Sequence, residues 1–229
     1  MSDQELPMRT IKSFVLRGGR MTDGQEKAFA NHWQVYGVEP DQALDAAKLF
    51  GRDAPVVLEI GYGMGLSLVE MASQEPDKDF VGIEVHRPGV AKLLMEAERS
   101  GLTNLKSYCF DAVEILNQQI ANGSLSRVQI YFPDPWHKKK HNKRRLIQIA
   151  FVELLASKLK PNGVLHMATD WEPYAEHMVE VMAASPQFEN TAQDGVFAAR
   201  PEWRPLTKFE QRGQRLGHGV WDLVFRKAD

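Results

Sequence analysis

Residues 56–65 decide the fold, and they read Val-Val-Leu-Glu-Ile-Gly-Tyr-Gly-Met-Gly. This short apolar run carries the acid Glu59 and leads into a loop with three glycines, Gly61, Gly63 and Gly65. An amphipathic stretch over residues 66–72 follows, so the predicted order is strand, glycine loop, helix. Such a loop lets a ligand approach the backbone closely. The dinucleotide fingerprint has a third glycine where this chain has Leu66, which disfavours a nicotinamide cofactor.

Short apolar runs alternate with longer amphipathic stretches on both sides of this segment. The apolar runs cover residues 56–58, 80–83, 105–110, 128–132 and 164–167, and the amphipathic stretches cover residues 66–72, 88–99, 112–120 and 146–159. This alternation predicts an α/β fold with a doubly wound, mostly parallel sheet and helices on both faces. We expect residues 221–225 to add an edge strand. The first fifty residues predict a basic extended segment and one or two helices, ending near Gly51.

Composition places the chain among globular proteins. It has 229 residues, of which 43% are hydrophobic and 25% charged, and it shows no repeat or flexible linker. We therefore expect an N-terminal extension, residues 1–50, packed on a single domain, residues 51–229. The one cysteine, Cys109, excludes a disulfide scaffold and is expected in the core. No apolar run reaches the ~18 residues of a membrane span, and no signal peptide is recognisable, so a cytoplasmic location is predicted.

The net charge of -2 hides one concentrated basic run. Residues 137–145 contain six lysines and arginines and no acid, namely Lys138, Lys139, Lys140, Lys143, Arg144 and Arg145. Smaller basic excesses occur in residues 9–20 and 200–215. A solvated helix face usually mixes charges of both signs, so this run favours a polyanionic partner. His137 and His141 lie four residues apart, but no cysteine or acid accompanies them at metal spacing, and no metal site is expected.

Five acids follow the five predicted strands: Glu59, Glu84, Asp111, Asp134 and Asp170. In an open α/β sheet the ligand crevice lies outside the carboxyl ends of the strands, so we expect these acids around one pocket. Asp111 and Asp170 also fit a simpler role as helix N-caps. Glu84 lies 23 residues after Gly61, near the spacing at which an acid binds ribose hydroxyls, which indicates an adenosine-type cofactor. The alternative is a tight glycine turn without a ligand.

The turn after the fourth strand is the most specific stretch of the chain. Residues 132–138 read Phe-Pro-Asp-Pro-Trp-His-Lys, so two prolines flank Asp134. The prolines restrict the backbone and prevent a helix from starting there, which holds the Asp134 carboxylate and Trp136 in place. A rigid loop with a packed tryptophan is the alternative interpretation. Because the basic run begins directly afterwards, we favour a functional site, with Trp136 as a candidate for stacking on a base.

Together these motifs resemble the bacterial tRNA (guanine-N7-)-methyltransferase family. The resemblance runs from about Arg9 to Phe225 and rests on the glycine loop and on residues 82–86, 132–138, 143–145, 168–171 and 207–213. It implies a Rossmann-like class I methyltransferase fold with a seven-stranded sheet. It also implies S-adenosyl-L-methionine as the methyl donor and guanine 46 of the tRNA variable loop as the target.

The resemblance also assigns roles to individual residues. It implies donor binding by Glu59, Glu84, Asp111 and Asp134, with Asp134 also catalytic, and substrate binding by Lys138, Asp170, Thr207, Lys208, Phe209 and Glu210. Guanine N7 has an in-plane lone pair and needs no strong base, so Asp134 is expected to orient the guanine and stabilise its developing positive charge. A catalytically idle RNA-binding module and a nicotinamide oxidoreductase are the alternatives.

Overall fold

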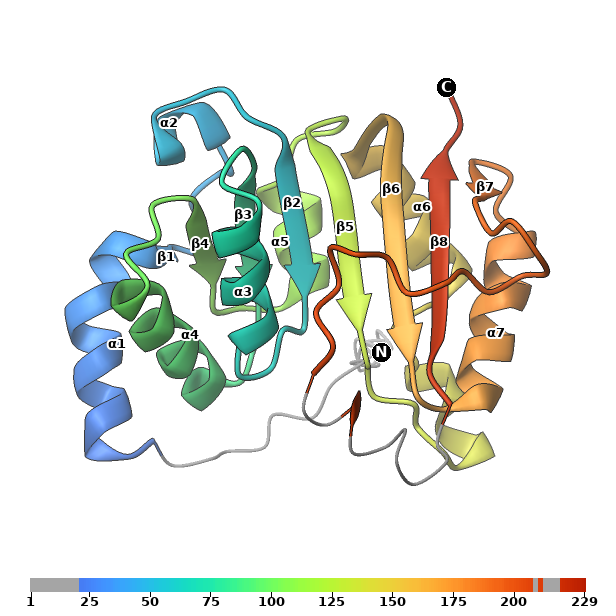
Figure 1. The fold of residues 1–229 in the computed structure, drawn as a ribbon, viewed down its shortest axis with the longest axis horizontal. Coiled ribbons are helices and arrows are strands. Elements are labelled where there is room, and N and C mark those ends of the chain that lie inside the picture. The colour runs from blue at the N-terminus through green and yellow to red at the C-terminus, as the bar shows by residue number, and fades with distance from the viewer. Residues whose placement is uncertain (1–20, 208–209, 212–218) are drawn as a thin grey trace, which may run out of the picture.

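The computed structural model describes residues 21–207, 210, 211 and 219–229. Within these residues it contains an eight-stranded sheet of order β1-β4-β3-β2-β5-β6-β8-β7, with helices on both faces (Figure 1). The strands are β1 Gly37–Val38, β2 Val56–Ile60, β3 Asp79–Ile83, β4 Leu105–Tyr108, β5 Leu125–Tyr131, β6 Leu159–Thr169, β7 Phe188–Asn190 and β8 Trp221–Lys227. The helices are α1 Asp23–Tyr36, α2 Ala46–Phe50, α3 Leu66–Gln74, α4 Arg87–Arg99, α5 Ala112–Gln118, α6 Ile149–Lys158 and α7 Glu172–Ala183, with the 3-10 helix η1 at Lys139–Arg144.

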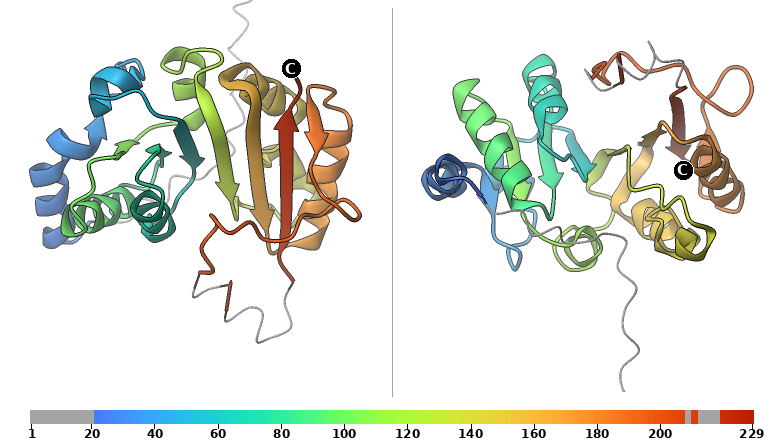
Figure 2. Two further views of the ribbon diagram at one scale, coloured as in Figure 1. Left: turned by 45° about the horizontal axis from the view of Figure 1, so that its top comes forward. Right: turned by 90° about the horizontal axis from the view of Figure 1, so that it is seen from below.

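The doubly wound α/β prediction is confirmed. Strands β1 to β6 pair in parallel, and β8 runs antiparallel to both β6 and β7. Apolar side chains from α3 and α4 pack on one face of the sheet and those from α5, α6 and α7 on the other (Figure 2). Because both faces are covered, every residue of β2 is buried, which explains why four of its five residues are apolar.

Two strands differ from the prediction. The sheet has one strand more than the seven expected, namely the two-residue β1, which follows α1 and pairs with β4. A strand of two residues is too short to show a periodicity in the sequence. Residues 221–225 do not form an edge strand, because β8 lies between β6 and β7. Residues 222–225 are all buried, so β8 is covered on both faces and shows no clear alternation. Helices α1 and α2 agree with the one or two helices predicted before Gly51, which is the C-cap of α2. The basic extended segment predicted before them falls in residues 1–20, outside the described residues.

The parallel order brings the functional candidates to one edge. The carboxyl ends of β2, β3, β4, β5 and β6 all lie at the bottom of the sheet in Figure 1. After β7, residues 191–207 cross in front of β8, β6 and β5 and then turn toward the same edge of the sheet (Figure 1). In the part of the chain that the structure describes, no helix has the length and apolar character needed to cross a membrane.

Candidate functional site

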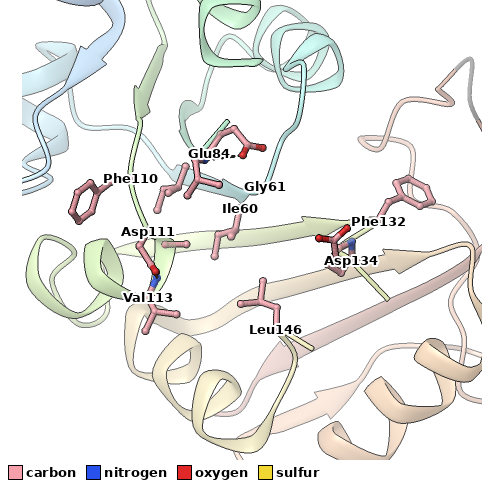
Figure 3. Close-up of a pocket in the computed structure, with 13 residues that line it drawn as sticks. Ile60, Gly61, Glu84, Phe110, Asp111, Val113, Phe132, Asp134 and Leu146 are labelled. Carbon is pink, nitrogen blue, oxygen red and sulfur yellow. Dashed lines mark hydrogen bonds between the residues drawn. The ribbon is translucent and has the colours of Figure 1, made fainter. Parts of the chain in front are cut away.

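Two cavities meet at the carboxyl edge of the sheet. The first has a volume of about 220 Å³ and is lined by Glu84, Asp111 and Asp134 together with apolar residues of the strand ends (Figure 3). Asp111 and Asp134 lie on opposite sides of it. The second has a volume of about 690 Å³ and lies between the glycine loop and residues 204–207. Gly61 and Phe132 line both cavities, so the two form neighbouring compartments of one site.

The glycine loop needs its glycines for their backbone conformation. Gly61, Gly63 and Gly65 have φ angles of 76°, 60° and 74°, in the left-handed region that other residues adopt only with strain. A β-carbon at Gly61 or Gly63 would meet no atom within 4 Å, so the space above the loop is open to a ligand. A β-carbon at Gly65 would collide with Leu93, so this glycine permits close packing of α3 on α4.

Glu84 fixes the shape of this loop. Its Oε2 atom accepts a hydrogen bond of 2.8 Å from the Gly63 backbone amide, and its Oε1 atom accepts from the amides of Val85 and His86 at 2.7 and 2.9 Å. A carboxylate has about four lone-pair sites, so these three bonds leave capacity for a ligand hydroxyl. Glu84 therefore joins the glycine loop to the start of α4 and still faces the first cavity.

Glu59 lies at the floor of the second cavity and is only 3% exposed. Its Oε2 atom accepts a 3.5 Å hydrogen bond from the Gln129 side-chain amide. Burial raises the pKa of Glu59 to about 8, against the lowering effects of Arg127 and Gln129. Gln129 Oε1 is buried without a hydrogen-bond partner. Burial at this position therefore favours the protonated form of the Glu59 carboxyl.

Of the two acids predicted as possible helix N-caps, Asp111 and Asp170, only the first is one. Asp111 is the N-cap of α5, where it accepts a 2.9 Å hydrogen bond from the Val113 amide, and it also lines the first cavity. Asp170 is not a cap, because α7 has Trp171 at its N-cap and the Trp171 amide donates to Thr169 Oγ1 at 3.2 Å. Asp170 follows β6 as predicted, but it is not among the residues that line either cavity.

The turn that carries Asp134 is conformationally strained at both ends. Phe132 and Trp136 have φ angles of 51° and 48°, although neither is glycine. Such residues cost of order 1–3 kcal/mol each and persist only where the surroundings hold them. Pro133 and Pro135 stand between them, and Asp134 is exposed at the rim of the first cavity. The predicted rigid turn is thus present, with its carboxylate directed toward the site (Figure 3).

The basic run forms the short helix η1, and it divides into two parts. Lys138, Lys139, Lys140 and Lys143 are exposed, and Arg144 is half-buried with its guanidinium 5.0 Å from the centre of the Trp136 ring. Arg145 is only 6% exposed and contacts protein groups. It therefore does not belong to the surface that the sequence assigned to a polyanion. The ring contact with Arg144 also shows that Trp136 already has a stacking partner within the chain.

Residues 204–207 and Gln211 form the outer wall of the second cavity. Thr207 lines this cavity, and its Oγ1 atom accepts a 3.1 Å hydrogen bond from the Glu210 amide. Glu210 is 2% exposed, and both of its carboxylate oxygens accept hydrogen bonds of 2.7 and 2.8 Å from Arg204. Glu210 thus holds Arg204, which lines the cavity, in place. Lys208 and Phe209, which the sequence assigned to substrate binding, lie outside the described residues.

The sequence did not predict the network around Arg204. Arg204 also donates to both oxygens of Asp222 on β8 at 2.7 and 2.8 Å, and Asp222 Oδ1 lies 2.7 Å from His166 Nε2. Trp203 donates to His166 Nδ1 at 3.1 Å. Because the indole is only a donor, Nδ1 must accept, so the neutral imidazole donates its Nε2 proton to Asp222. Burial lowers the pKa of His166, more than Asp222 raises it, which agrees with the neutral form.

A weak signal of this network exists in the sequence. His166 and Asp222 interrupt otherwise apolar strands, and a polar residue inside such a strand usually needs a buried partner.

Cys109 is partly buried and packs on the core, as predicted. The described residues contain no group of three histidine, cysteine or acidic side chains that could hold a metal ion.

Comparisons with known proteins agree with this geometry. Residues 53–223 match the family described as "Putative methyltransferase". The tRNA (guanine-N(7)-)-methyltransferase of Alcanivorax borkumensis is 63% identical over 96% of this chain and 92% of its own length. The enzyme of the same name from Aeromonas hydrophila is 59% identical over 97% of this chain and 94% of its own length.

Solved structures support the fold. The 16S rRNA methyltransferase KamB has a TM-score of 0.60 at 17% identity and covers 82% of this chain and 95% of its own. The aminoglycoside resistance methyltransferase NpmB1 has a TM-score of 0.51 at 14% identity and covers 92% of this chain and 95% of its own. These likenesses confirm the class I methyltransferase fold. With near full-length identities of about 60%, the chain belongs to the tRNA (guanine-N7-)-methyltransferase family.

Proposed function

We propose that the protein transfers a methyl group from S-adenosyl-L-methionine to N7 of guanine 46 in the variable loop of tRNA. The observation that carries this proposal is the meeting of two cavities at Gly61 and Phe132, one lined by Asp134 and the other bounded by the glycine loop and Thr207. A donor and an acceptor can meet at that junction. A cytoplasmic location, and the division into an N-terminal extension, residues 1–50, and a catalytic domain, residues 51–229, belong to the same proposal.

The donor site fits S-adenosyl-L-methionine. Glu84 retains acceptor capacity for ribose hydroxyls, and Asp111 faces the same cavity from the start of α5. The open space above Gly61 and Gly63 permits close approach of a ligand to the backbone. Glu59 lies beneath the loop, where a carboxylate would meet a ligand ammonium group. When bound, the donor supplies a methyl group on a positively charged sulfur, and these residues hold and orient it.

Asp134 is the catalytic residue in this proposal. Its carboxylate accepts hydrogen bonds from the N1–H and N2–H edge of guanine, which directs N7 toward the methyl carbon. Alignment of the reacting atoms at about 3–3.5 Å supplies several kcal/mol of barrier reduction. The negative charge also stabilises the positive charge that develops on the purine. No proton has to leave N7 before the attack, so positioning and electrostatics are sufficient.

The tRNA docks on the exposed part of the basic run. Lys138, Lys139, Lys140, Lys143 and Arg144 contact phosphates, which explains a strong local positive charge on a mildly acidic protein. The proposed substrate-binding set also includes Asp170, which follows β6, Thr207, which lines the second cavity, and Lys208, Phe209 and Glu210, of which Glu210 acts through its ion pair with Arg204. An idle RNA-binding module would not need the complete set of strand-end acids, so a catalytic role is better supported.

One assay tests the function directly. Total tRNA lacking 7-methylguanosine is incubated with the protein and labelled S-adenosyl-L-methionine. The product is then digested in parallel to nucleosides, which identify the modified base, and to oligonucleotides, which locate it in the tRNA. We expect labelled 7-methylguanosine at position 46. Labelled product at a different base would refute the proposed target, and no product despite binding of S-adenosylhomocysteine would favour the idle module. Calorimetry with NAD in place of S-adenosylhomocysteine provides the control for a nicotinamide site.

A further inference from the structure

Arg145 differs from the other basic residues of its run. It is 6% exposed, whereas Lys138, Lys139, Lys140 and Lys143 are exposed. Its Nε atom donates a 3.0 Å hydrogen bond to the Pro135 carbonyl, and one terminal nitrogen donates to the Pro173 carbonyl at 3.5 Å. The guanidinium lies 4.9 Å from the centre of the Tyr174 ring. A phosphate contact needs these donors to face solvent, and here they face the protein.

The contacts of Arg145 join three separate segments. Pro135 belongs to the turn after β5, Arg145 ends η1, and Pro173 and Tyr174 belong to the first turn of α7. The Tyr174 ring is fully buried, and its hydroxyl accepts a 3.2 Å hydrogen bond from the Ile147 amide. The surface on which the guanidinium rests is therefore itself fixed. Among the described residues, no carboxylate forms an ion pair with Arg145.

The turn needs an external donor. Pro133 and Pro135 have no backbone N–H, so the turn loses two donors that could tie it to neighbouring segments. Phe132 and Trp136 at its ends are held in the left-handed region, which requires support from their surroundings. The Pro135 carbonyl is in the residue directly after Asp134, and Arg145 binds that carbonyl. Movement of this peptide would move the Asp134 carboxylate.

We propose that Arg145 is a positioning residue that holds the Asp134 turn in its catalytic conformation rather than a tRNA contact. The inference rests on the proposed function of Asp134. A planar guanidinium can donate to two carbonyls and stack on an aromatic ring at the same time, whereas a lysine ammonium cannot reproduce this geometry. Position 145 therefore requires an arginine, because a positive charge alone does not provide these contacts.

The test separates positioning from docking and from folding. Arg145→Met and Arg145→Lys are compared with Arg144→Met, a change at its half-buried neighbour in the basic run, and with Lys160→Met, a change at an exposed lysine near the amino end of β6. Four quantities are measured: the melting temperature, the Kd for S-adenosylhomocysteine, the salt dependence of tRNA affinity, and kcat at saturating substrates. For Arg145→Met we expect kcat to fall about 100-fold, as for a misplacement of about 1 Å. The salt slope and the Kd for S-adenosylhomocysteine should stay at wild-type values.

The remaining variants sharpen this result. Arg144→Met should flatten the salt slope, and Lys160→Met should match wild type in all four measurements. In an Asp134→Ala background, Arg145→Met should change kcat by less than about threefold, because residues that act as a unit are not additive. If Arg145→Met does not fold, Arg145→Lys decides, with an expected loss of about tenfold in kcat.

Three results would overturn the proposal. They are a wild-type kcat in a folded Arg145→Met or Arg145→Lys variant, a flattened salt slope with kcat retained, and a full additional loss in the Asp134→Ala background. Failure of the proposed function looks different, because the wild-type protein itself would then produce no 7-methylguanosine.

Discussion

The two sides of the site are built by different forces. The donor side, made of the glycine loop and the ends of β2, β3 and β4, is held by backbone conformation, by apolar packing and by the hydrogen bonds of one carboxylate, Glu84, to backbone amides. The acceptor side, made of the Asp134 turn, η1 and residues 203–207, 210 and 211, is held by the buried polar side chains of Arg145, Arg204, His166 and Asp222. The regular sheet edge places most of the donor side, whereas the irregular segments of the acceptor side depend on a network of contacts between buried charged and polar side chains.

Two buried acids show the same contrast. Glu59 on the donor side has a pKa raised to about 8 because burial outweighs its polar contacts. Burial would also raise the pKa of Asp222 on the acceptor side, but hydrogen bonds from His166 and Arg204 together lower it. Burial thus favours the neutral form of Glu59, whereas the contacts with His166 and Arg204 favour the ionised form of Asp222. The following predictions test this difference, beginning with the largest effect.

The largest effect is expected at Asp134. Asp134→Ala should lower kcat by about 10²–10³-fold, because it removes a charge aimed at the reacting base. The tRNA affinity should hold or rise slightly, since the loss of hydrogen bonds to one base is offset by the loss of repulsion between the carboxylate and the phosphates. Asp134→Asn is the matched control, as it keeps the shape and removes the charge. Single-turnover kinetics and filter binding check both expectations, and a loss of tRNA affinity equal to the loss of kcat would reassign Asp134 to substrate binding.

The second effect concerns the stability of the acceptor side. Arg204→Met leaves the buried carboxylates of Glu210 and Asp222 without their partner, and we expect a loss of about 3–5 kcal/mol in the free energy of unfolding. Adding Glu210→Gln and Asp222→Asn should recover most of it, because no buried charge then remains unpaired. Urea denaturation measures both variants. A single variant as stable as wild type would show that the network does not hold this wall.

The contrast between the two sides also explains what the sequence predicts. The glycine loop and the strand-end acids follow from local patterns, because each acid directly follows an apolar run. The burial of Arg145 could not be predicted, because its neighbours Lys143 and Arg144 carry the same charge. Arg145 differs from them through its contact with the start of α7, which lies far away in the sequence. The Arg204 network joins residues up to 56 positions apart, as His166 and Asp222 are. The left-handed conformations of Phe132 and Trp136 likewise depend on contacts that no local pattern encodes.

The third effect is the pH dependence of stability on the donor side. Because the pKa of Glu59 is raised from 4.5 to about 8, its contribution to stability is fully present below pH 4.5 and is lost as the pH rises through about 8. The slope approaches ~1.4 kcal/mol per pH unit in that window. Glu59→Gln removes this titration, so the stability of wild type relative to the variant should fall between these pH values. Urea denaturation from pH 5 to 9 measures it, and parallel curves would show that Glu59 titrates normally.

The smallest effect is expected on the exposed surface of the acceptor side, where charges are screened by solvent. Lys143→Gln and Arg144→Gln should each reduce the slope of log affinity for tRNA against log salt by ~0.7–0.9, because each removes one phosphate contact. Lys143 gives the cleaner result, since Arg144 also contacts the Trp136 ring. Lys160→Gln, near the amino end of β6, serves as the control and should leave the slope unchanged. If a variant with both Lys143→Gln and Arg144→Gln kept the wild-type slope, η1 would be an ordinary solvated surface. The tRNA contacts would then have to be sought in residues 9–20 and 200–215, the other basic parts of the chain.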